Sequence, residues 1–211
     1  MNNLANALEC FVHDEKTAWM LSQIMEYARK SGKIDYSRVE EIAGDNAEDI
    51  ILTGWQWRLL IPVRTSRCGE WDDRVIMLEP GEEFEMPNIV CFLVDEAISS
   101  RKWNTHLAVE IYFQQSHERD WDKLPDLVMR IKEMCSNYTI DAPGISKACN
   151  AAGLKDRADT MIAILKGAGV ISPKLGSLAL VSEFGAPLYE FNPSVFAEST
   201  VGLHVSDSGT L

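Results

Sequence analysis

The sequence predicts an α+β protein, mostly helical, in which one arrangement of helices and strands occurs twice. Three observations support this prediction: an internal repeat, apolar residues at helical spacing, and polar turns between short apolar segments. The aligned positions of the repeat include Leu21 with Leu127, Met25 with Ile131, Ile34-Asp35 with Ile140-Asp141, and, after a small insertion in the second copy, Leu60-Ile61 with Val170-Ile171. We therefore expect two similar folding units.

The first copy begins with a long helix. Its apolar residues recur at helical spacing over 14–30, and Ser31-Gly32 ends it because glycine tolerates the left-handed conformation of a helix end. Ser37 and Glu40 fit a capping box that begins a short second helix. A third helix is expected over 46–57, followed by strands over 59–65 and 74–78 that a polar turn over 66–73 joins.

A different region follows Pro80-Gly81. Residues 88–101 and 105–115 both have apolar faces at helical spacing, so we expect two helices between the copies. These helices have two interpretations: a connector that packs against both copies, or a dimerisation element. Because their apolar faces are broad, we expect a homodimer.

The second copy begins near Trp121 and repeats the pattern. Asp141 occupies the position of a helix N-cap, and Gly167-Ala168-Gly169 ends the third helix. Small polar residues over 197–211 predict a flexible tail. The expected helices cover 123–136, 144–151 and 155–166, and the expected strands cover 170–172, 178–181 and 188–191, with a polar turn over 182–187.

The order of elements in each copy is long helix, short helix, helix, and two strands joined by a polar turn. This order resembles a winged helix-turn-helix domain over roughly residues 14–79 and 121–196, although no signature motif accompanies it. The resemblance implies two winged-helix domains over 1–80 and 121–196, a helical connector or dimerisation element over 81–120, and the tail. Members of this superfamily include transcription regulators, chromosome-segregation adaptors, and polymerase or sorting-complex subunits. Many place the third helix in the DNA major groove, and others use the same surface for proteins.

The charge of the chain restricts contact with nucleic acid. The net charge is −12, and residues 1–80, 81–120 and 121–211 carry −5, −5 and −2. Surfaces that bind DNA attract phosphates with clustered Lys and Arg, and no region of this chain is strongly basic. Any DNA-binding surface must therefore be a local basic stripe on an acidic protein.

The best candidate for such a stripe lies in the second copy. Lys155, Arg157 and Thr160 have the spacing of one exposed face at the start of the third helix, and Lys147 and Lys174 are expected beside them. An ordinary solvated helix face is the alternative interpretation.

The corresponding region of the first copy is less suited to DNA. Its third helix opens with Glu48 and Asp49, which phosphates would repel and which complement the helix dipole instead. Arg64 and Arg67 lie in or beside the first polar turn and are candidates for phosphate contacts. Several acids surround them, so solvated ion pairs within the chain are the alternative.

The tryptophans suggest a second function. Trp71 is a large aromatic residue in an acidic turn, where it would require a partner surface, whereas Trp19 and Trp55 fall on inward helix faces and are expected in the core. We therefore carry two hypotheses. The first is a non-enzymatic, transcription-regulator-like protein that binds DNA mainly through its second domain. The alternative is an acidic tandem winged-helix adaptor that binds protein partners, with Trp71 as an anchor.

Other classes have little support in the sequence. Cys10 and His13 have suitable spacing for a metal, but no second pair of ligands follows, so we expect no metal and no cofactor. No glycine-rich phosphate loop or nucleophile elbow occurs, so we expect no enzymatic activity. The five scattered cysteines favour reduced thiols in a cytoplasmic protein, and no apolar segment reaches the length of a membrane span.

Overall fold

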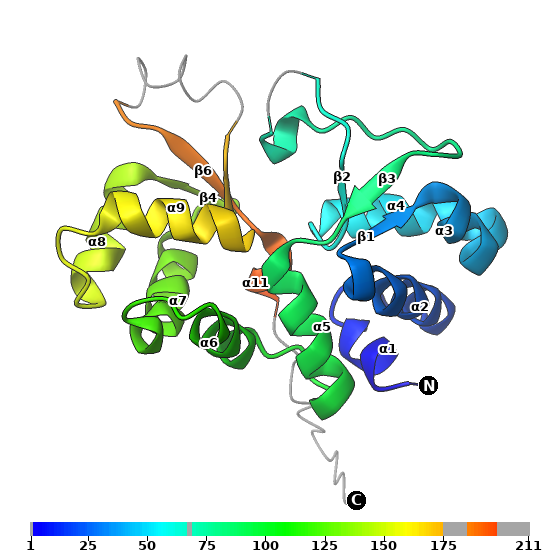
Figure 1. Ribbon diagram of the computed structural model, residues 1–211, viewed down its shortest axis with the longest axis horizontal. Helices are drawn as coiled ribbons and strands as arrows, with labels where there is room; N and C mark the ends of the chain where they lie inside the picture. Colours follow the sequence, from blue (N-terminus) through cyan, green and yellow to red (C-terminus); the bar gives the residue numbers. More distant parts are fainter. Residues whose placement is uncertain (1, 67–68, 175–184, 198–211) are drawn as a thin grey trace, which may run out of the picture.

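The structure of the protein is a computed structural model that describes residues 2–66, 69–174 and 185–197. The first half runs from residue 2 to 86, and the second half from residue 121 to 197, with two helices between them (Figure 1). The first half contains α1 (Asn3–Leu8), α2 (Glu15–Ser31), β1 (Lys33–Asp35), α3 (Tyr36–Ala43), the 3-10 turn η1 (Gly44–Asn46), α4 (Ala47–Gln56), β2 (Ile61–Pro62), the 3-10 turn η2 (Trp71–Asp73) and β3 (Glu83–Glu85).

The remaining elements complete the repeat. The two helices between the halves are α5 (Asn88–Ser100) and α6 (Thr105–Gln115). The second half contains the 3-10 turn η3 (Trp121–Lys123), α7 (Leu124–Met134), β4 (Thr139–Asp141), α8 (Ala142–Ala151), α9 (Ala158–Ala168), β5 (Ile171–Pro173), β6 (Leu188–Phe191) and α11 (Pro193–Phe196). The protein is therefore α+β and mostly helical, as the sequence predicts.

Each half holds a three-stranded antiparallel sheet with the same topology. The strand orders are β1-β3-β2 and β4-β6-β5, so the last strand of each half lies between the other two. In the first sheet Lys33 faces Glu85, and in the second sheet Thr139 faces Glu190. Since β1 and β4 are aligned in the sequence repeat, Glu85 and Glu190 occupy equivalent positions.

The shared Ile-Asp sequence has one local role in both halves. Asp35 and Asp141 each end a short strand, and each side chain then caps the following helix by accepting a hydrogen bond from a backbone N–H, at 3.1 Å from Arg38 and 2.8 Å from Gly144. The N-cap expected at Asp141 is confirmed. The capping box expected at Ser37 is wrong, because the helix begins at Tyr36 and Asp35, two residues before Ser37, supplies the cap.

The expected strand over 74–78 is also wrong. Only an isolated bridge joins Thr65 to Arg74, and β2 pairs instead with β3. In β3 the buried Phe84 lies between Glu83 and Glu85, an alternation that suits a strand with one buried face. The first sheet consequently extends past the domain boundary expected at residue 80, and the 20 residues from 63 to 82 connect its last two strands.

Most helices agree with the sequence analysis. The long first helix ends at Gly32, whose φ of 76° is the left-handed cap expected there, and Gly169 ends α9 in the same way with φ of 77°. The third helix of the second half begins later than expected, at Ala158, because residues 155–157 form a turn in which Asp156 has φ of 62°. Helix α1 was not predicted. The strand expected over 178–181 and most of the turn expected over 182–187 lie outside the described residues.

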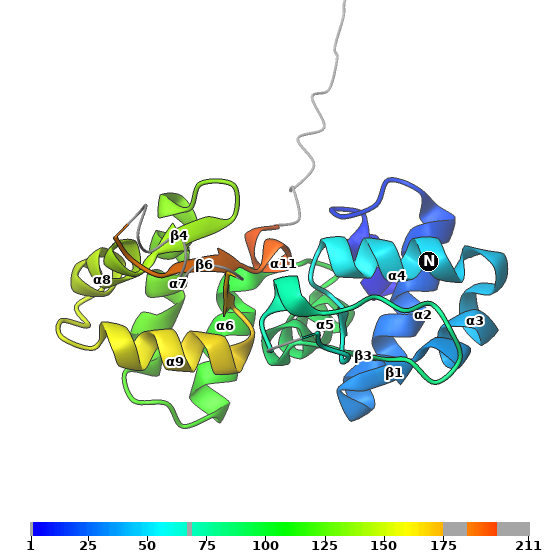
Figure 2. The same cartoon turned by 90° about the horizontal axis from the view of Figure 1, so that it is seen from above.

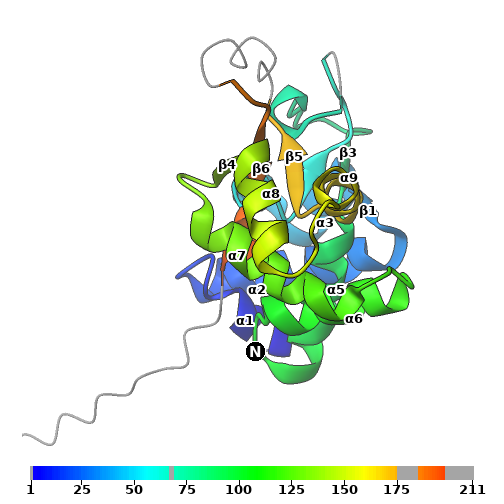
Figure 3. The same ribbon diagram turned by 90° about the vertical axis from the view of Figure 1, so that its left-hand side faces the viewer.

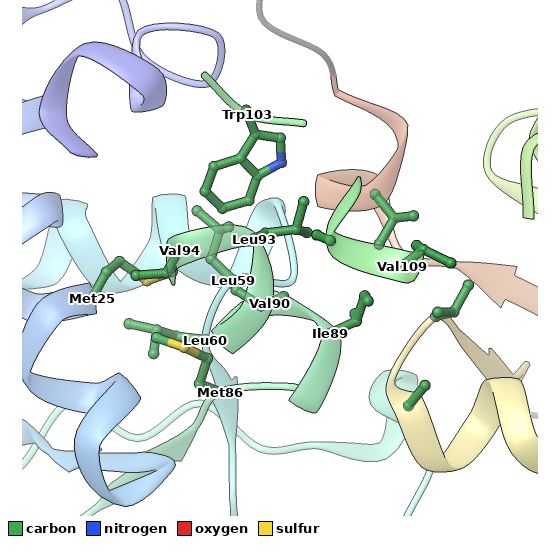
Figure 4. Close-up of a cluster of buried hydrophobic side chains, with 14 of the residues drawn as sticks. Met25, Leu59, Leu60, Met86, Ile89, Val90, Leu93, Val94, Trp103 and Val109 are labelled. Carbon is green, nitrogen blue, oxygen red and sulfur yellow. The ribbon is translucent and has the colours of Figure 1, made fainter. Parts of the chain in front are cut away.

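Helix α5 joins the two halves through their cores. Its buried side chains are Ile89, Val90, Leu93, Val94 and Ala97. They extend on one side toward α2 and the segment after α4, and on the other toward α6 and α9 (Figure 4). Helix α5 thus packs against elements of both halves, as the connector interpretation expects. Its own apolar face is covered by the protein itself, and the homodimer stays an untested prediction.

The end of the second half returns to the centre of the molecule. Trp103, which precedes α6, donates its indole N–H to the carbonyl of Ser194 at 2.8 Å, and Ser194 donates its backbone N–H to the carbonyl of Trp57 at 3.1 Å. Seen from above, α11 lies with α5 between the two halves (Figure 2). One apolar core therefore runs through both halves.

The molecule has a helical end and a strand-rich end. In side view, α1 and α5 lie at one end, and β5, β6 and η2 lie toward the other (Figure 3). None of the helices among the described residues has the length and apolar character that crossing a membrane requires.

Candidate binding sites

Arg157, the central residue of the expected basic stripe, is bound within the chain. Its guanidinium donates to the carboxylate of Asp120 at 2.6 Å and lies 3.7 Å from that of Glu118. Asp120 also accepts from Lys123 at 3.0 Å, and this bond together with the nearby cations lowers the pKa of the Asp120 carboxyl. A phosphate would have to displace these carboxylates, so Arg157 is poorly suited to bind one.

The other members of the expected basic stripe differ in their exposure and in their hydrogen bonds. Lys147, Lys155 and Thr160 are exposed, as expected. Lys174 is half-buried, and its side chain reaches from the end of β5 across β6 to donate to the hydroxyl of Thr139 on β4 at 3.3 Å. The structure thus leaves two exposed lysines, on α8 and on the turn before α9, for contact with a partner.

In the first half, the structure differs more from the contacts that the sequence predicts. Arg64 is exposed but donates to Glu82 at 2.7 Å, as the alternative of an internal ion pair predicted. Arg67 lies outside the described residues. Trp71 is buried, with only 6% of its surface exposed, and its backbone N–H donates to the hydroxyl of Ser172 in the second half. The expectation of an exposed anchor at Trp71 is therefore wrong.

The expectation for Trp19 is wrong in the opposite direction. This residue lies on α2 and is 47% exposed, although its spacing predicts an inward position. Trp55 is partly buried and lies beneath the guanidinium of Arg58, 3.7 Å from ring centre to the central guanidinium carbon. Two tryptophans are therefore placed opposite to their expected positions. Trp71, expected at the surface, is buried, and Trp19, expected in the core, is exposed.

A groove lies between α8, α9 and the segment before β6. Its volume is about 590 Å³, and its charged lining residues are Asp156 and Asp159, both acids. Apolar surface comes from Pro143, Ile162 and Pro187, and Ser146 adds a hydroxyl. An extended ligand that carries positive charge next to small apolar groups would complement this lining.

The groove was not predicted from the sequence. Asp156 and Asp159 alternate with the cations Lys155 and Arg157 along the chain, so the segment looks mixed in charge. The turn before α9 separates the two signs, since the acids line the groove while Arg157 is held by Asp120. The left-handed backbone of Asp156 is part of this turn.

Comparison with known proteins gives one match. A protein-family model covers residues 2–199. The chain belongs to this family. The match includes both halves and the helices between them, so the family is defined over the whole two-part arrangement. No curated protein and no solved structure matches the chain.

The two halves are also joined by an ion pair that the sequence analysis missed. Arg58 has left-handed backbone (φ 53°) where the chain turns after α4, and its guanidinium donates to the Glu190 carboxylate of the second half at 3.0 Å. Both side chains are 12% exposed. Burial raises the pKa of Glu190, and the nearby Asp72 adds to this effect while Arg58 opposes it. The pair is structural, because it lies within the joint of the halves.

The cysteines and potential metal ligands remain dispersed. Cys10, Cys91, Cys135 and Cys149 are free thiols, and Cys68 lies outside the described residues. Burial raises the pKa of Cys10 and of Cys135 to about 12, which makes their reactive thiolate forms rare at neutral pH. Over the described parts of the chain, no three His, Cys, Asp or Glu side chains converge as metal ligands.

Proposed function

We propose that the protein is a non-enzymatic adaptor built from two winged-helix units, and that it binds a basic segment of a protein partner in the groove between α8 and α9. The single observation that carries the proposal is the acidic lining of this groove. In winged-helix proteins the equivalent surface beside the third helix is where DNA or protein partners bind.

The element order supports the winged-helix assignment of each half. Helix, strand, helix, helix and two strands follow one another in both halves, and the last strand lies between the other two. In this assignment α3 and α4, and likewise α8 and α9, form the helix-turn-helix. The groove then lies between the two helices of the second motif and the segment that enters its last strand.

Electrostatics favour a protein partner over DNA. Asp156 and Asp159 give the groove a negative charge, which favours cationic ligands. The net charge of −12 also attracts basic proteins and repels nucleic acid. Of the cations expected to contact phosphates, Arg64 and Arg157 are held in ion pairs. The partner segment we propose therefore carries Lys or Arg next to small apolar residues.

DNA binding through the second half is the competing proposal. It is favoured by the exposure of Lys147, Lys155 and Thr160, which lie in or between the two helices α8 and α9. The two proposals differ in the sign of the residues they require, so one pair of variants separates them.

The test compares an acid-neutralising variant, Asp156→Asn with Asp159→Asn, with a lysine-neutralising variant, Lys147→Gln with Lys155→Gln. Asparagine is chosen at position 156 because it tolerates left-handed backbone. Each variant is titrated by fluorescence anisotropy against short peptides that alternate Lys or Arg with Val or Ala, against matched peptides with Glu in place of the cations, and against mixed-sequence duplex DNA at low salt.

For an adaptor, only the basic peptides bind the wild-type protein. The acid-neutralising variant then weakens binding by about ten- to thirtyfold, because each exposed ion pair contributes up to about 1 kcal/mol, and the lysine-neutralising variant keeps the wild-type affinity. If the protein binds DNA at low salt, if the lysine-neutralising variant loses that binding, and if the acid-neutralising variant strengthens it, the DNA proposal replaces ours. Circular dichroism of both variants checks that the helical content of the chain is unchanged.

A further inference from the structure

A second cavity lies at the joint of the two halves, away from the groove. Its volume is about 460 Å³, within the size range of small-molecule sites, which often occur where domains meet. The first half contributes the segment from Gly69 to Arg74 and the end of the sheet at Glu85, and the second half contributes the end of α9 and β5. Figure 1 shows these elements on the two sides of the centre of the molecule.

The charged residues of this joint cavity comprise two acids and two bases. Glu70, Arg74 and Glu85 come from the first half, and Lys166 comes from the second. Arg74 is already engaged: it donates to Glu85 at 3.0 Å and to the backbone carbonyl of Val63 at 3.0 Å. Arg74 and Glu85 therefore satisfy each other and leave Glu70 and Lys166.

Among the residues that the structure describes, neither Glu70 nor Lys166 forms an ion pair. One carboxylate oxygen of Glu70 is buried and accepts no hydrogen bond from the described residues. Lys166 is exposed, and across the parts of the chain that the structure describes no ion pair or hydrogen bond of its ammonium occurs. Glu70 and Lys166 both line the cavity, so a ligand there can offer a cation to the carboxylate and an anion to the ammonium.

The rest of the lining is mixed. Asn88 and Ser172 are polar, and the apolar residues are Ile61, Trp71, Met86, Pro87, Ile171 and Pro173. The wall is tightly closed where the halves meet: a Cβ added at Gly169 would lie 2.6 Å from the Cβ of Pro87. The cavity thus combines a carboxylate, an ammonium group and several apolar side chains, and the four charges of its lining cancel.

From this chemistry we infer that the joint cavity binds a small zwitterion with an apolar side chain, the chemistry of a free aliphatic or aromatic α-amino acid. Glu70 receives the ammonium group, Lys166 receives the carboxylate, and the apolar residues contact the side chain. A polyphosphate does not suit the site, because Glu70 and Glu85 would repel it. A bound zwitterion touches both halves and so favours the arrangement in which they are closed on each other.

The experiment measures thermal unfolding of the full chain in the presence of each of the common L-α-amino acids, of their N-acetylated amides, and of inorganic phosphate. At about ten times its dissociation constant, a ligand of the folded state raises the midpoint by roughly 3–6 °C for a chain of this size. We expect this rise with one or more of the apolar amino acids. The N-acetylated amides, which lack both charges, produce none.

Two variants test the assignment of the charges. Glu70→Gln and Lys166→Gln should each abolish the rise, whereas Lys147→Gln, at an exposed position outside the cavity, should leave it unchanged. The inference is overturned if no amino acid raises the midpoint, if phosphate raises it more, or if the rise persists in both variants. The groove variants Asp156→Asn and Asp159→Asn retain the rise, so this result is independent of the outcome for the adaptor proposal.

Discussion

The two halves place a glutamate at the same position of the central strand, and they use it differently. Glu85 in the first half accepts from Arg74, which belongs to the same half, and its side chain is 36% exposed. Glu190 in the second half accepts from Arg58, which reaches across from the first half, and its side chain is 12% exposed. The glutamate at this position therefore forms an ion pair within the first half, whereas its equivalent in the second half forms an ion pair that joins the two halves.

This difference teaches how a repeated fold acquires distinct surfaces. In the first half, Trp71 on the segment between β2 and β3 is buried, and its backbone N–H donates to Ser172 of the second half. The second half keeps the region beside α8 and α9 open as an acidic groove. The repeated elements supply the scaffold, and the segments between them decide which face is buried and which remains available.

The largest effect on stability is expected when the arginine that pairs with each glutamate is removed. Arg58→Ala leaves Glu190 as a buried charge without its partner, so we expect the free energy of unfolding to fall by about 3 kcal/mol or more. Arg74→Ala leaves Glu85 partly hydrated and is expected to cost about 1–2 kcal/mol, mainly through lost hydrogen bonds to backbone carbonyls. Urea denaturation followed by circular dichroism measures both. Equal losses would contradict the distinction between the two glutamates.

A double variant sharpens that result. Replacing the buried pair together, as Arg58→Met with Glu190→Leu, removes the desolvation cost of both charges. We expect it to recover most of the stability that Arg58→Ala loses, because well-packed apolar residues replace buried ion pairs at little cost. A double variant that is less stable than Arg58→Ala would show that the pair itself, and not the isolated Glu190, determines the stability of the joint.

The helix caps test the part of the halves that is alike. Asp35→Ala and Asp141→Ala each remove the side chain that accepts from the first turn of a helix. Each is expected to lower the free energy of unfolding by about 1 kcal/mol, and Asp→Asn at either position by less, since asparagine also caps helices. Urea denaturation of the four variants checks this. A loss at only one of the two positions would mean that the repeat is not equivalent at its caps.

A smaller effect concerns pH and separates the two glutamates again. Burial raises the pKa of Glu190 above its ordinary value of 4.5, so the folded state holds this proton more tightly than the unfolded state. The contribution of Glu190 to stability is therefore full below the ordinary pKa and declines as the pH rises toward the folded pKa. We expect the stability of the wild-type protein relative to Glu190→Gln to fall over this range. The difference between Glu190→Gln and wild type would be independent of pH if the pKa were unchanged.

The smallest effect is chemical and leaves stability untouched. Cys10 in the first half and Cys135 in the second have pKa values raised to about 12 by burial. We expect iodoacetamide to alkylate both far more slowly in the folded protein at neutral pH than in urea, where thiols regain their ordinary pKa. Mass spectrometry of the two peptides measures the rates. Fast labelling of one cysteine in the folded protein would reveal local opening of its half.

The helices of the two halves and of the connector were predictable because their signals are local. Residues 88–100 show their apolar period within a few turns, and Asp141 occupies its cap position beside the helix it caps. The strand β3 was missed because three residues, Glu-Phe-Glu, carry a weak alternation. The polar turn and the apolar residues over 75–78 suggested a regular hairpin, of which the chain forms only the isolated bridge between Thr65 and Arg74.

The features that define the sites depend on residues that are distant in the sequence. Arg58 and Glu190 are 132 residues apart, and Trp71 and Ser172 are 101 apart, so neither contact leaves a local pattern. Trp71 was assigned to the surface because acids surround it in the chain. Arg157 was expected to be free because Asp120, which binds it, lies 37 residues earlier.

Helix α5 has a consequence for how the protein responds to denaturant. Its apolar face is buried by elements of both halves, so neither half retains a complete core when the other unfolds. The free energies of the two halves are thereby coupled, and the chain should lose structure in one cooperative transition. The sequence repeats a unit, but the whole chain unfolds as one unit. A fragment cut on either side of α5 would contain the helices and strands of one half and would not be stable on its own.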